Sequence, residues 1–310
     1  MDVVSATALP PDGVVSLVDL GGGAHLPVHY RAGSTPTLLI LFHGAVDQKL
    51  RAKPHFQPLF NHTFGAHQLA ISDPGLARSD ELKLTWYLGH DGLDLPALLP
   101  GYFRAMASAG RFKRVIYFGA SGGGHAALHY SFHHPDSLAL AVNPQIDLSR
   151  YQDEQAITDY RLHCWAGLGS NDELRRHVPM DLPSVYAGGL RNFVCLLNSS
   201  GDRHHLLDHT LPFLARIPAA SQNRVLLHAD FYGVLGHATS VPYKSCVPWI
   251  KASVYSPNLY ADSLLAKRHQ FGAASAPARP AAAAAGPAGP SADDLRIAAA
   301  IRAHVLGDPR

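Results

Sequence analysis

The stretch from residue 115 to residue 128 constrains the fold of this chain most, because it joins a strand pattern to a helix pattern through small residues. Residues 115–118, Val-Ile-Tyr-Phe, form the β-branched and aromatic run typical of a buried strand. The sequence after residue 124 is rich in alanine and predicts a helix, which should end before Pro135. A sharp strand-to-helix turn is therefore expected around Ser121.

Ser121 lies in a G-x-S-x-G pattern with Gly119 and Gly123. In a nucleophile elbow this spacing exposes the serine on a tight turn, and the glycines let the strand and the helix approach closely. The N-terminus of the helix then points its free N–H groups at the reacting centre. The alternative is a glycine-rich turn that binds a phosphate or only reverses the chain, but no G-x-x-x-x-G-K-[ST] pattern is present. The flanking strand and helix therefore predict that Ser121 is a nucleophile.

Composition excludes several classes of protein. Hydrophobic residues make up 47% of the chain and charged residues 16%, which is enough apolar sequence for a large core. The formal net charge of +2 argues against nucleic-acid binding. The three cysteines are too few and too scattered for a disulfide framework or a cysteine zinc site. We find no run long enough to span a membrane and no signal peptide, so a cytoplasmic protein is expected.

The 20 histidines raise the question of a metal site. His205 and His209 are four residues apart, as are His125 and His129. The chain has no H-E-x-x-H pattern, however, and no carboxylate is obviously paired with these histidines as a third ligand. We therefore expect no metal and no cofactor, and we expect most histidines to be surface or pocket residues.

Short apolar runs recur along the chain and alternate with helical patterns, such as residues 102–109. This alternation predicts an α/β fold with a mostly parallel sheet and helices on both faces. The first two runs flank three glycines at 21–23 and suggest a hairpin. The predicted strands are 14–18, 26–30, 37–42, 69–72, 115–118, 138–142, 192–198 and 224–229.

The domain organisation follows from changes in composition. Residues 1–270 are expected to form one domain with an insertion at 146–191, where charged helical pieces alternate with glycine and proline. This insertion is either a cap over a pocket or a packing helix with long loops. Residues 271–290 are a low-complexity Ala/Pro/Gly linker. Residues 291–310 are predicted to form a short amphipathic helix that could dock a protein partner.

Polar residues follow several predicted strands, where ligands of open parallel sheets bind. Asp202 comes just after the strand at 192–198, and His237 lies on a loop after the last strand. Asp73 begins a turn after the strand at 69–72, and we expect it to form that turn rather than a pocket wall. Four further strand-end residues are candidates for substrate binding, although each could only shape its loop: His43, Gly44, Asn143 and Gln145.

A serine hydroxyl needs a base to take its proton and a third group to orient that base. Ser121, Asp202 and His237 follow one another along the chain in the order nucleophile, acid, base. Asp208 and Asp230 are alternative acids, but Asp208 should fall in the following helix and Asp230 is very close in sequence to His237. We therefore predict a Ser121–His237–Asp202 triad.

With these motifs, roughly the first 255 residues resemble the α/β-hydrolase superfamily in the order of their elements. The resemblance implies an eight-stranded sheet, serine-dependent acyl chemistry, and an oxyanion hole made by the backbone N–H groups of Gly122 and Ala45. The run 121–124, followed by 143–145, also resembles hydrolase-like proteins associated with bacterial surface-polysaccharide biosynthesis. We further expect the three consecutive glycines at 122–124 to widen the pocket near Ser121.

Three functions fit this sequence. The first is hydrolysis of a carboxylic ester through an acyl-enzyme, with a small-molecule or glycan ester as the substrate. The second is acyl transfer or deacetylation on a glycan or another metabolite, which the same triad could perform. The third is a non-catalytic binding protein of the same fold, which the complete triad order disfavours.

Overall fold

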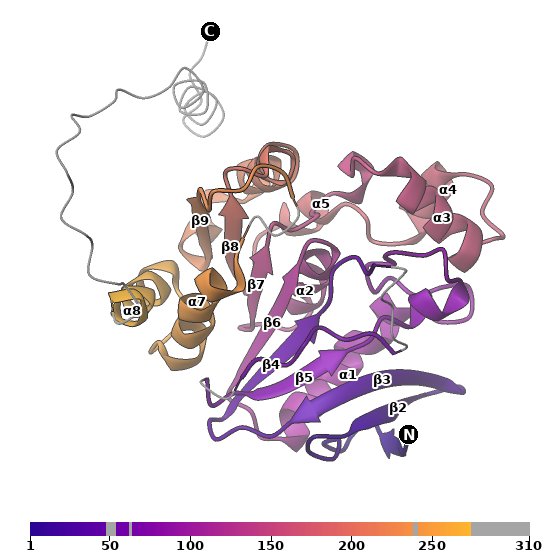
Figure 1. Ribbon diagram of the computed structural model, residues 1–310, viewed down its shortest axis with the longest axis horizontal. Helices are drawn as coiled ribbons and strands as arrows, with labels where there is room; N and C mark the ends of the chain where they lie inside the picture. Colours follow the sequence, from indigo (N-terminus) through magenta and orange to yellow (C-terminus); the bar gives the residue numbers. More distant parts are fainter. Residues whose placement is uncertain (48–53, 62–63, 238–240, 274–310) are drawn as a thin grey trace, which may run out of the picture.

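The computed structural model describes residues 1–47, 54–61, 64–237 and 241–273 (Figure 1). These residues form a sheet of nine strands in the order β1-β2-β3-β5-β4-β6-β7-β8-β9. The strands are β1 (Val3–Ser5), β2 (Val15–Gly21), β3 (Ala24–Arg31), β4 (Thr37–Phe42), β5 (His67–Ile71), β6 (Arg114–Ala120), β7 (Leu138–Val142), β8 (Phe193–Ser199) and β9 (Val225–Asp230).

The six strands β5-β4-β6-β7-β8-β9 are parallel to one another, whereas β3 pairs antiparallel with both β2 and β5. The predicted parallel sheet and the hairpin at 21–23 are therefore confirmed. The sheet has one strand more than the eight that the resemblance implied, because β1 adds beside β2 at the edge. With three residues and a mostly exposed face, β1 leaves too short a pattern to read from the sequence.

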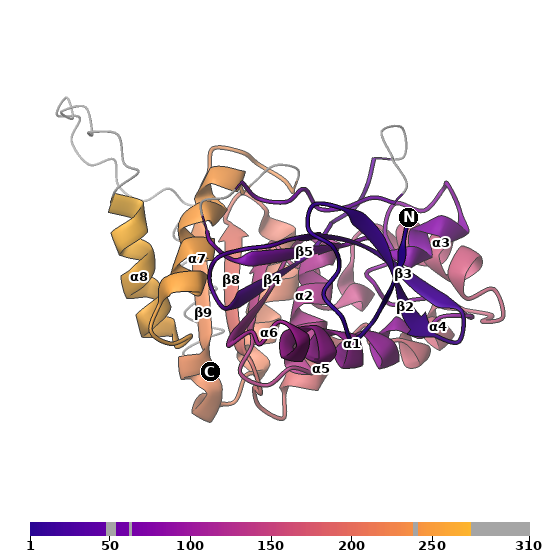
Figure 2. The same cartoon turned by 90° about the horizontal axis from the view of Figure 1, so that it is seen from below.

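Helices cover both faces of the sheet (Figure 2). The long helices are α1 (Leu95–Ala109), α2 (Gly122–Phe132), α7 (Tyr243–Tyr255) and α8 (Ala261–Ala273), and the shorter ones are α5 (Leu182–Tyr186) and α6 (Leu211–Arg216). In strand β4, Leu38, Ile40 and Phe42 pack on one side with α1 and α2, while Leu39 and Leu41 pack on the other with α7 and α8. A strand buried on both faces is a continuous apolar run in the sequence.

Helix α1 begins at Leu95, well before the predicted start at residue 102. Asp94 caps it by accepting a hydrogen bond from the backbone N–H of Ala97, and a proline occupies the first turn, where its missing N–H costs nothing. Pro100 lies inside the helix. The predicted start was late because prolines usually argue against a helix, whereas here Asp94 caps the first turn.

The predicted insertion at 146–191 is helical throughout its regular parts and contains no strand, all of it being described. Besides α5 it holds a short helical turn, η2 (Leu148–Arg150), and the helices α3 (Glu154–Cys164) and α4 (Asn171–His177). Its Ile157 and Tyr160 pack in one cluster with Leu84 and Trp86 of the loop that follows β5. Figure 1 shows α3 and α4 beyond the carboxyl ends of the strands, where a cap would lie.

The C-terminal part of the described chain ends in α8, which reaches Ala273 and so extends into the predicted linker at 271–290. Alanine and the long side chains before it favour the helix over a linker there. Most of that linker and the predicted helix at 291–310 lie outside the described residues. A search of the described part finds no helix of sufficient length and apolarity to cross a bilayer.

Candidate active site

Ser121 occupies the turn between β6 and α2 with φ of 56° and ψ of −120°, a strained backbone conformation for a residue with a side chain. The glycines on either side permit it. A Cβ at Gly119 would overlap the carbonyl of Gly123, and one at Gly123 would lie 2.5 Å from the carbonyl oxygen of Phe42. The local geometry is thus that of the predicted elbow.

The three consecutive glycines do not widen the pocket, and this expectation from the sequence is wrong. A Cβ at Gly122 would lie 2.6 Å from Leu84 Cδ1, and one at Gly124 would lie 2.8 Å from Pro144 Cβ. Neighbouring side chains and backbone already fill the space that the missing side chains leave. The glycines therefore allow close packing around the turn.

The side chain of Gln145 contacts the predicted nucleophile directly. Its Nε2 donates to Ser121 Oγ at 3.0 Å, and its Oε1 accepts from Trp86 Nε1 at 2.6 Å. Because an indole N–H can only donate, Trp86 fixes which end of the amide faces the serine. Gln145 and Trp86 are buried, and Ser121 is 8% exposed. Of the residues predicted to bind substrate, Gln145 is the one that touches the nucleophile through its side chain.

Asp202 and His237 meet beyond the ends of the neighbouring strands β8 and β9. His237 Nδ1 lies 2.6 Å from Asp202 Oδ2, and the backbone N–H of Gly236 donates to the carbonyl of Gly201 at 2.9 Å, which joins the two loops. Asp202 is buried, whereas the His237 side chain is 35% exposed. Burial acts to raise the pKa of Asp202, but hydrogen bonds from His205 and His237 outweigh it and hold that pKa well below its usual value.

The two alternative acids have other partners. Asp208 accepts from His204 Nδ1 at 2.8 Å on the same helix, and its side chain is half exposed. Asp230 ends β9, is exposed and accepts from the backbone N–H of Phe231. Asp202 is therefore the one of the three predicted candidates that hydrogen-bonds His237.

His205 is the residue of this site that the sequence analysis missed. Its Nδ1 lies 2.9 Å from Asp202 Oδ1, and its ring stacks on the ring of His237 with centroids 4.0 Å apart and an angle of 16° between the planes. The expectation that these histidines lack a carboxylate partner is thus wrong for His205. The signal was an aspartate three residues before it, at the start of the π-helix η3 (His205–Thr210).

Asp202, His205 and His237 are also the one group in the described chain that could hold a metal ion, with ligand atoms within 4.8 Å of one another. Two Nδ1–carboxylate hydrogen bonds, at 2.9 and 2.6 Å, already join these atoms. Coordination of an ion through them would require both Nδ1 protons to leave. The arrangement therefore fits a hydrogen-bonded pair of histidines on one carboxylate.

His43 and Asn143 are buried side chains that serve the backbone. His43 pairs through Nδ1 with the carbonyl of Gly44 at 2.8 Å, and its Nε2 accepts from the backbone N–H of Asp73 at 3.3 Å. Asn143, at φ of 39°, accepts from the backbone N–H of Ser199 at 2.8 Å and so joins the ends of β7 and β8. Both residues shape the carboxyl edge of the sheet.

The strand end that should supply an oxyanion donor lies beside the elbow. A Cβ on Gly44 would be 3.5 Å from Ser121 Cβ, and Ala45 follows with an exposed side chain. Gly122 begins α2 directly after Ser121. The backbone of 44–45 and the start of α2 therefore flank the nucleophile.

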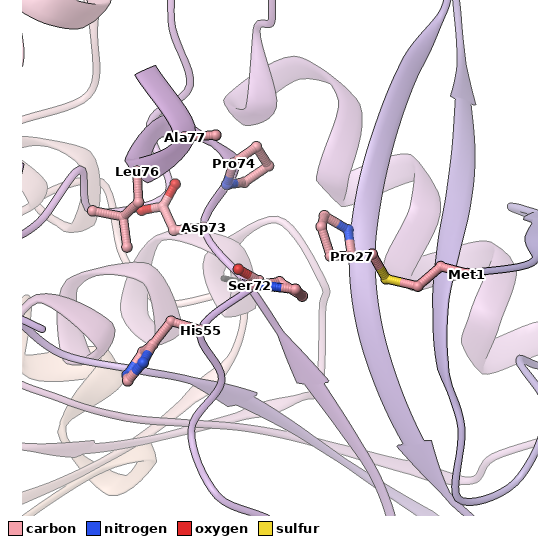
Figure 3. A pocket seen from close by; sticks show the side chains of 9 residues that line it. Met1, Pro27, His55, Ser72, Asp73, Pro74, Leu76 and Ala77 are labelled. Atoms are coloured by element: carbon pink, nitrogen blue, oxygen red, sulfur yellow. The ribbon is translucent and has the colours of Figure 1, made fainter. Parts of the chain in front are cut away.

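A cavity of about 280 Å³ opens next to this edge, at the end of β5 (Figure 3). Its wall includes Pro27, Leu76 and His55, and the His55 ring packs edge-on against His43 at 4.9 Å between centroids. Asp73 caps the turn η1 (Pro74–Arg78), as predicted, but it also lines this cavity, so the expectation that it would not be a pocket wall is wrong. Burial raises the pKa of Asp73 to about 6, although hydrogen bonds from the backbone N–H groups of Tyr87 and Gly75 oppose the rise.

Solved structures share this architecture. MPT51 (FbpC1) of Mycobacterium tuberculosis aligns with a TM-score of 0.52 and 16% identity over 80% of this chain and 98% of that one. An acylaminoacyl peptidase in complex with Z-Gly-Gly-Phe-chloromethyl ketone aligns with a TM-score of 0.50 and 13% identity over 78% of this chain and 42% of that one. The chain has the α/β-hydrolase fold. The resemblance read from its motifs is confirmed at that level.

A capsule O-acetyltransferase of Neisseria meningitidis serogroup A is also similar, with a TM-score of 0.49 and 16% identity over 83% of this chain and 93% of that one. No protein-family profile matches the sequence, and no curated protein sequence matches it. At sequence identities this low, similarity to solved structures shows the fold alone, so the chemistry must be argued from the residues of the site.

Proposed function

We propose that this protein is a serine hydrolase that cleaves a carboxylic ester through Ser121, His237 and Asp202. The observation that carries the proposal is the hydrogen-bonded His237–Asp202 pair at the same sheet edge as a serine held in a strained elbow. Strands β6, β7, β8 and β9 are consecutive in the sheet and parallel, so their carboxyl ends bring the three residues to one side.

In the proposed mechanism Ser121 Oγ attacks the ester carbonyl and His237 takes its proton. Because Nδ1 of His237 donates to Asp202, Nε2 is the ring nitrogen that would take the serine proton. The low pKa of Asp202 keeps that carboxylate ionised beside the imidazolium that forms. His237 then returns the proton to the leaving alcohol, and water resolves the acyl-enzyme.

Backbone N–H groups of Gly122 and Ala45 would stabilise the oxyanion of the tetrahedral intermediate. Loss of one such donor typically costs about 2.7–4 kcal/mol of transition-state stabilisation. Gln145 is not one of these two oxyanion donors. Its Nε2 donates to Ser121 Oγ, so the serine oxygen accepts this hydrogen bond and its own proton can still pass to the base. Its fixed amide would hold the hydroxyl in place before substrate arrives.

Acyl transfer or deacetylation on a glycan or metabolite is the second candidate. The insertion favours it, because Tyr160 of α3 packs edge-on against Trp86, which in turn holds Gln145 beside Ser121. A cap this close could limit water and admit an acceptor alcohol. The expected small-molecule or glycan ester substrate, the cytoplasmic location and a protein partner for residues 291–310 all stay predictions.

Labelling with a fluorophosphonate probe tests the nucleophile. We expect wild type and Ser253→Ala to be labelled and Ser121→Ala to be unlabelled, with all three folded by circular dichroism. Ser253 is a matched control, because its hydroxyl only donates to the carbonyl of Trp249 within α7. Labelling of Ser121→Ala at another serine would contradict the assignment.

Product analysis distinguishes the two reactions. An activated acetyl ester is supplied with and without a sugar alcohol, and the fate of the acetyl group is measured. A hydrolase releases acetate in both cases, whereas an acyltransferase forms the sugar ester. No turnover of any ester by a labelled enzyme would favour the binding protein of the same fold.

A further inference from the structure

We propose that His205 is a positioning residue of the active site, which occupies the second oxygen of Asp202 and fixes the ring plane of His237. The inference rests on the proposed function, in which His237 is the base. With His205, a fourth side chain joins the three proposed triad residues. Neither the G-x-S-x-G pattern nor the order of the triad residues along the chain predicts a histidine at this position.

The carboxylate of Asp202 accepts hydrogen bonds from His205 on one oxygen and from His237 on the other. His205 Nδ1 lies 2.9 Å from Oδ1, and the backbone N–H of His205 donates to the same oxygen at 3.3 Å. His237 Nδ1 lies 2.6 Å from Oδ2. A carboxylate held at both oxygens cannot rotate about its terminal bond without breaking a hydrogen bond. His205 therefore fixes the direction of the oxygen that faces His237.

The stacked ring of His205 constrains His237 in a second way. The two rings are nearly parallel, with centroids 4.0 Å apart. The His205 side chain is fully buried, whereas that of His237 is 35% exposed on a loop. His205 thus covers one face of the His237 ring, and solvent reaches other parts of that ring. Contact on that face restricts tilting of the imidazole, so the direction of its Nε2 is set.

The surroundings of His205 keep it neutral. Its Nε2 is buried and has no hydrogen-bond partner among the described residues. Burial lowers the pKa of His205, the positive charge of His237 lowers it further, and Asp202 opposes both. His204 and His209 face it from its own helix, and His125 of α2 lies beyond His209. A neutral His205 can serve Asp202 without placing a second positive charge against the His237 imidazolium.

Three substitutions separate the hydrogen bond from the stacking. His205→Asn can still present an amide N–H to Asp202 but loses the ring, and His205→Phe keeps a ring but loses the donor. His205→Gln places its amide too far out to replace Nδ1 and serves as a second variant without the hydrogen bond. His209→Asn is the matched control, because it removes a buried histidine of the same helix whose Nδ1 accepts from the backbone N–H of Asp147.

The readout is the pH profile of kcat/KM on one activated ester. In His205→Phe and His205→Gln the imidazole donor to Asp202 Oδ1 is lost and only the backbone N–H of residue 205 remains on that oxygen, so the carboxylate charge acts more strongly on His237 and favours its imidazolium. Their acid limb should therefore move to higher pH by about 0.4–1.1 units, the equivalent of one hydrogen bond. His205→Asn should keep the acid limb and lower kcat by up to about tenfold. His209→Asn should change neither quantity.

A proton spectrum gives a readout that does not depend on turnover. We expect two downfield Nδ1 resonances in Ser121→Ala, one for each histidine on Asp202, and one in Ser121→Ala/His205→Gln. Acid limbs that coincide in all variants, or two downfield resonances without His205, would overturn the inference. If Ser121 still takes the fluorophosphonate in that case, only the role of His205 has failed. If Ser121 is unreactive in wild type, the proposed function fails and this inference with it.

Discussion

Replacement of Asp202 by asparagine tests the geometry of the site most directly. Asp202 accepts one Nδ1 hydrogen bond on each oxygen, from His205 and from His237. Asparagine has one acceptor oxygen and one NH2 group, so one of the two histidines must face a donor. That histidine then accepts at Nδ1 and carries its proton on Nε2.

The two histidines are not equally able to make this change. Nε2 of His205 is buried and has no partner in the described part of the chain, so a proton there would be an unsatisfied donor that costs about 1–3 kcal/mol. The side chain of His237 is 35% exposed, and solvent can serve its Nε2–H. The asparagine oxygen should therefore face His205, which leaves His237 in the tautomer that cannot accept the serine proton.

The expected loss of activity has two parts. A bias of about 1–3 kcal/mol toward the wrong tautomer lowers the active fraction by roughly 5- to 150-fold. The lost negative charge, which stabilises the imidazolium, accounts for the rest. In a comparable triad the full change lowers kcat by about 10⁴, or roughly 5.5 kcal/mol.

The assay is kcat/KM on one activated ester for Asp202→Asn, Asp208→Asn and Asp230→Asn, with thermal melts of each. The last two should change little, since Asp208 pairs with His204 and Asp230 with backbone. Near-wild-type activity of Asp202→Asn beside the collapse of another variant would show that the acid is misassigned. If all three are active, the triad is wrong.

A double variant examines the competition between the two histidines. In Asp202→Asn/His205→Phe no imidazole competes with His237 for the asparagine oxygen, and only the long hydrogen bond from the backbone N–H of residue 205 opposes its turn toward His237. We expect this variant to be more active than Asp202→Asn, within the roughly 5- to 150-fold that the tautomer bias explains. Equal or lower activity in a folded double variant would refute the competition argument.

Three further predictions concern stability and the tail. Gln145→Leu leaves the buried indole N–H of Trp86 without its acceptor, so urea titration should show a loss of about 1–3 kcal/mol in unfolding free energy. Burial lowers the pKa of His209 to about 3, so the unfolded chain binds more protons than the folded one between that value and about 6.5. Stability should therefore fall as pH decreases through this window, and His209→Asn should flatten the fall; an unchanged slope would contradict it. Deletion of 274–310 should leave the melting temperature and esterase activity nearly unchanged, because α8 ends at Ala273 and the Ala/Pro/Gly composition beyond it should isolate the tail. A large loss of either would mean that the tail packs on the domain.

The fold could be predicted from the sequence because its signals are local. The runs at 37–42 and 138–142 are strands buried on both faces, so apolar residues follow one another without interruption. The elbow is a pattern of five consecutive residues, in which Gly119 is required by its contact with Gly123 inside the turn, whereas Gly123 makes room for the end of β4 at Phe42. Because the carboxyl ends of parallel strands share one edge, the position of Asp202 just after a strand favoured it over Asp208, and the closeness of Asp230 to His237 in sequence disfavoured Asp230.

The tertiary structure alone decided which side chains meet at that edge. Gln145 and Trp86 are 59 residues apart, and His237 and Asp202 are 35 apart, so their contacts depend on how separate loops pack. The three glycines at 122–124 suggested open space, but the neighbours that fill it, Leu84 and Pro144, come from other loops. His205 was interpreted as one of a spaced pair with His209, whereas the π-helix and the loop after β9 bring it into contact with both Asp202 and His237. Local patterns were enough to predict the strands and the turn, because a strand buried on both faces is a continuous apolar run and the elbow is a short consecutive pattern. The partners of the Asp202 carboxylate were set by packing between distant segments, which no local pattern records.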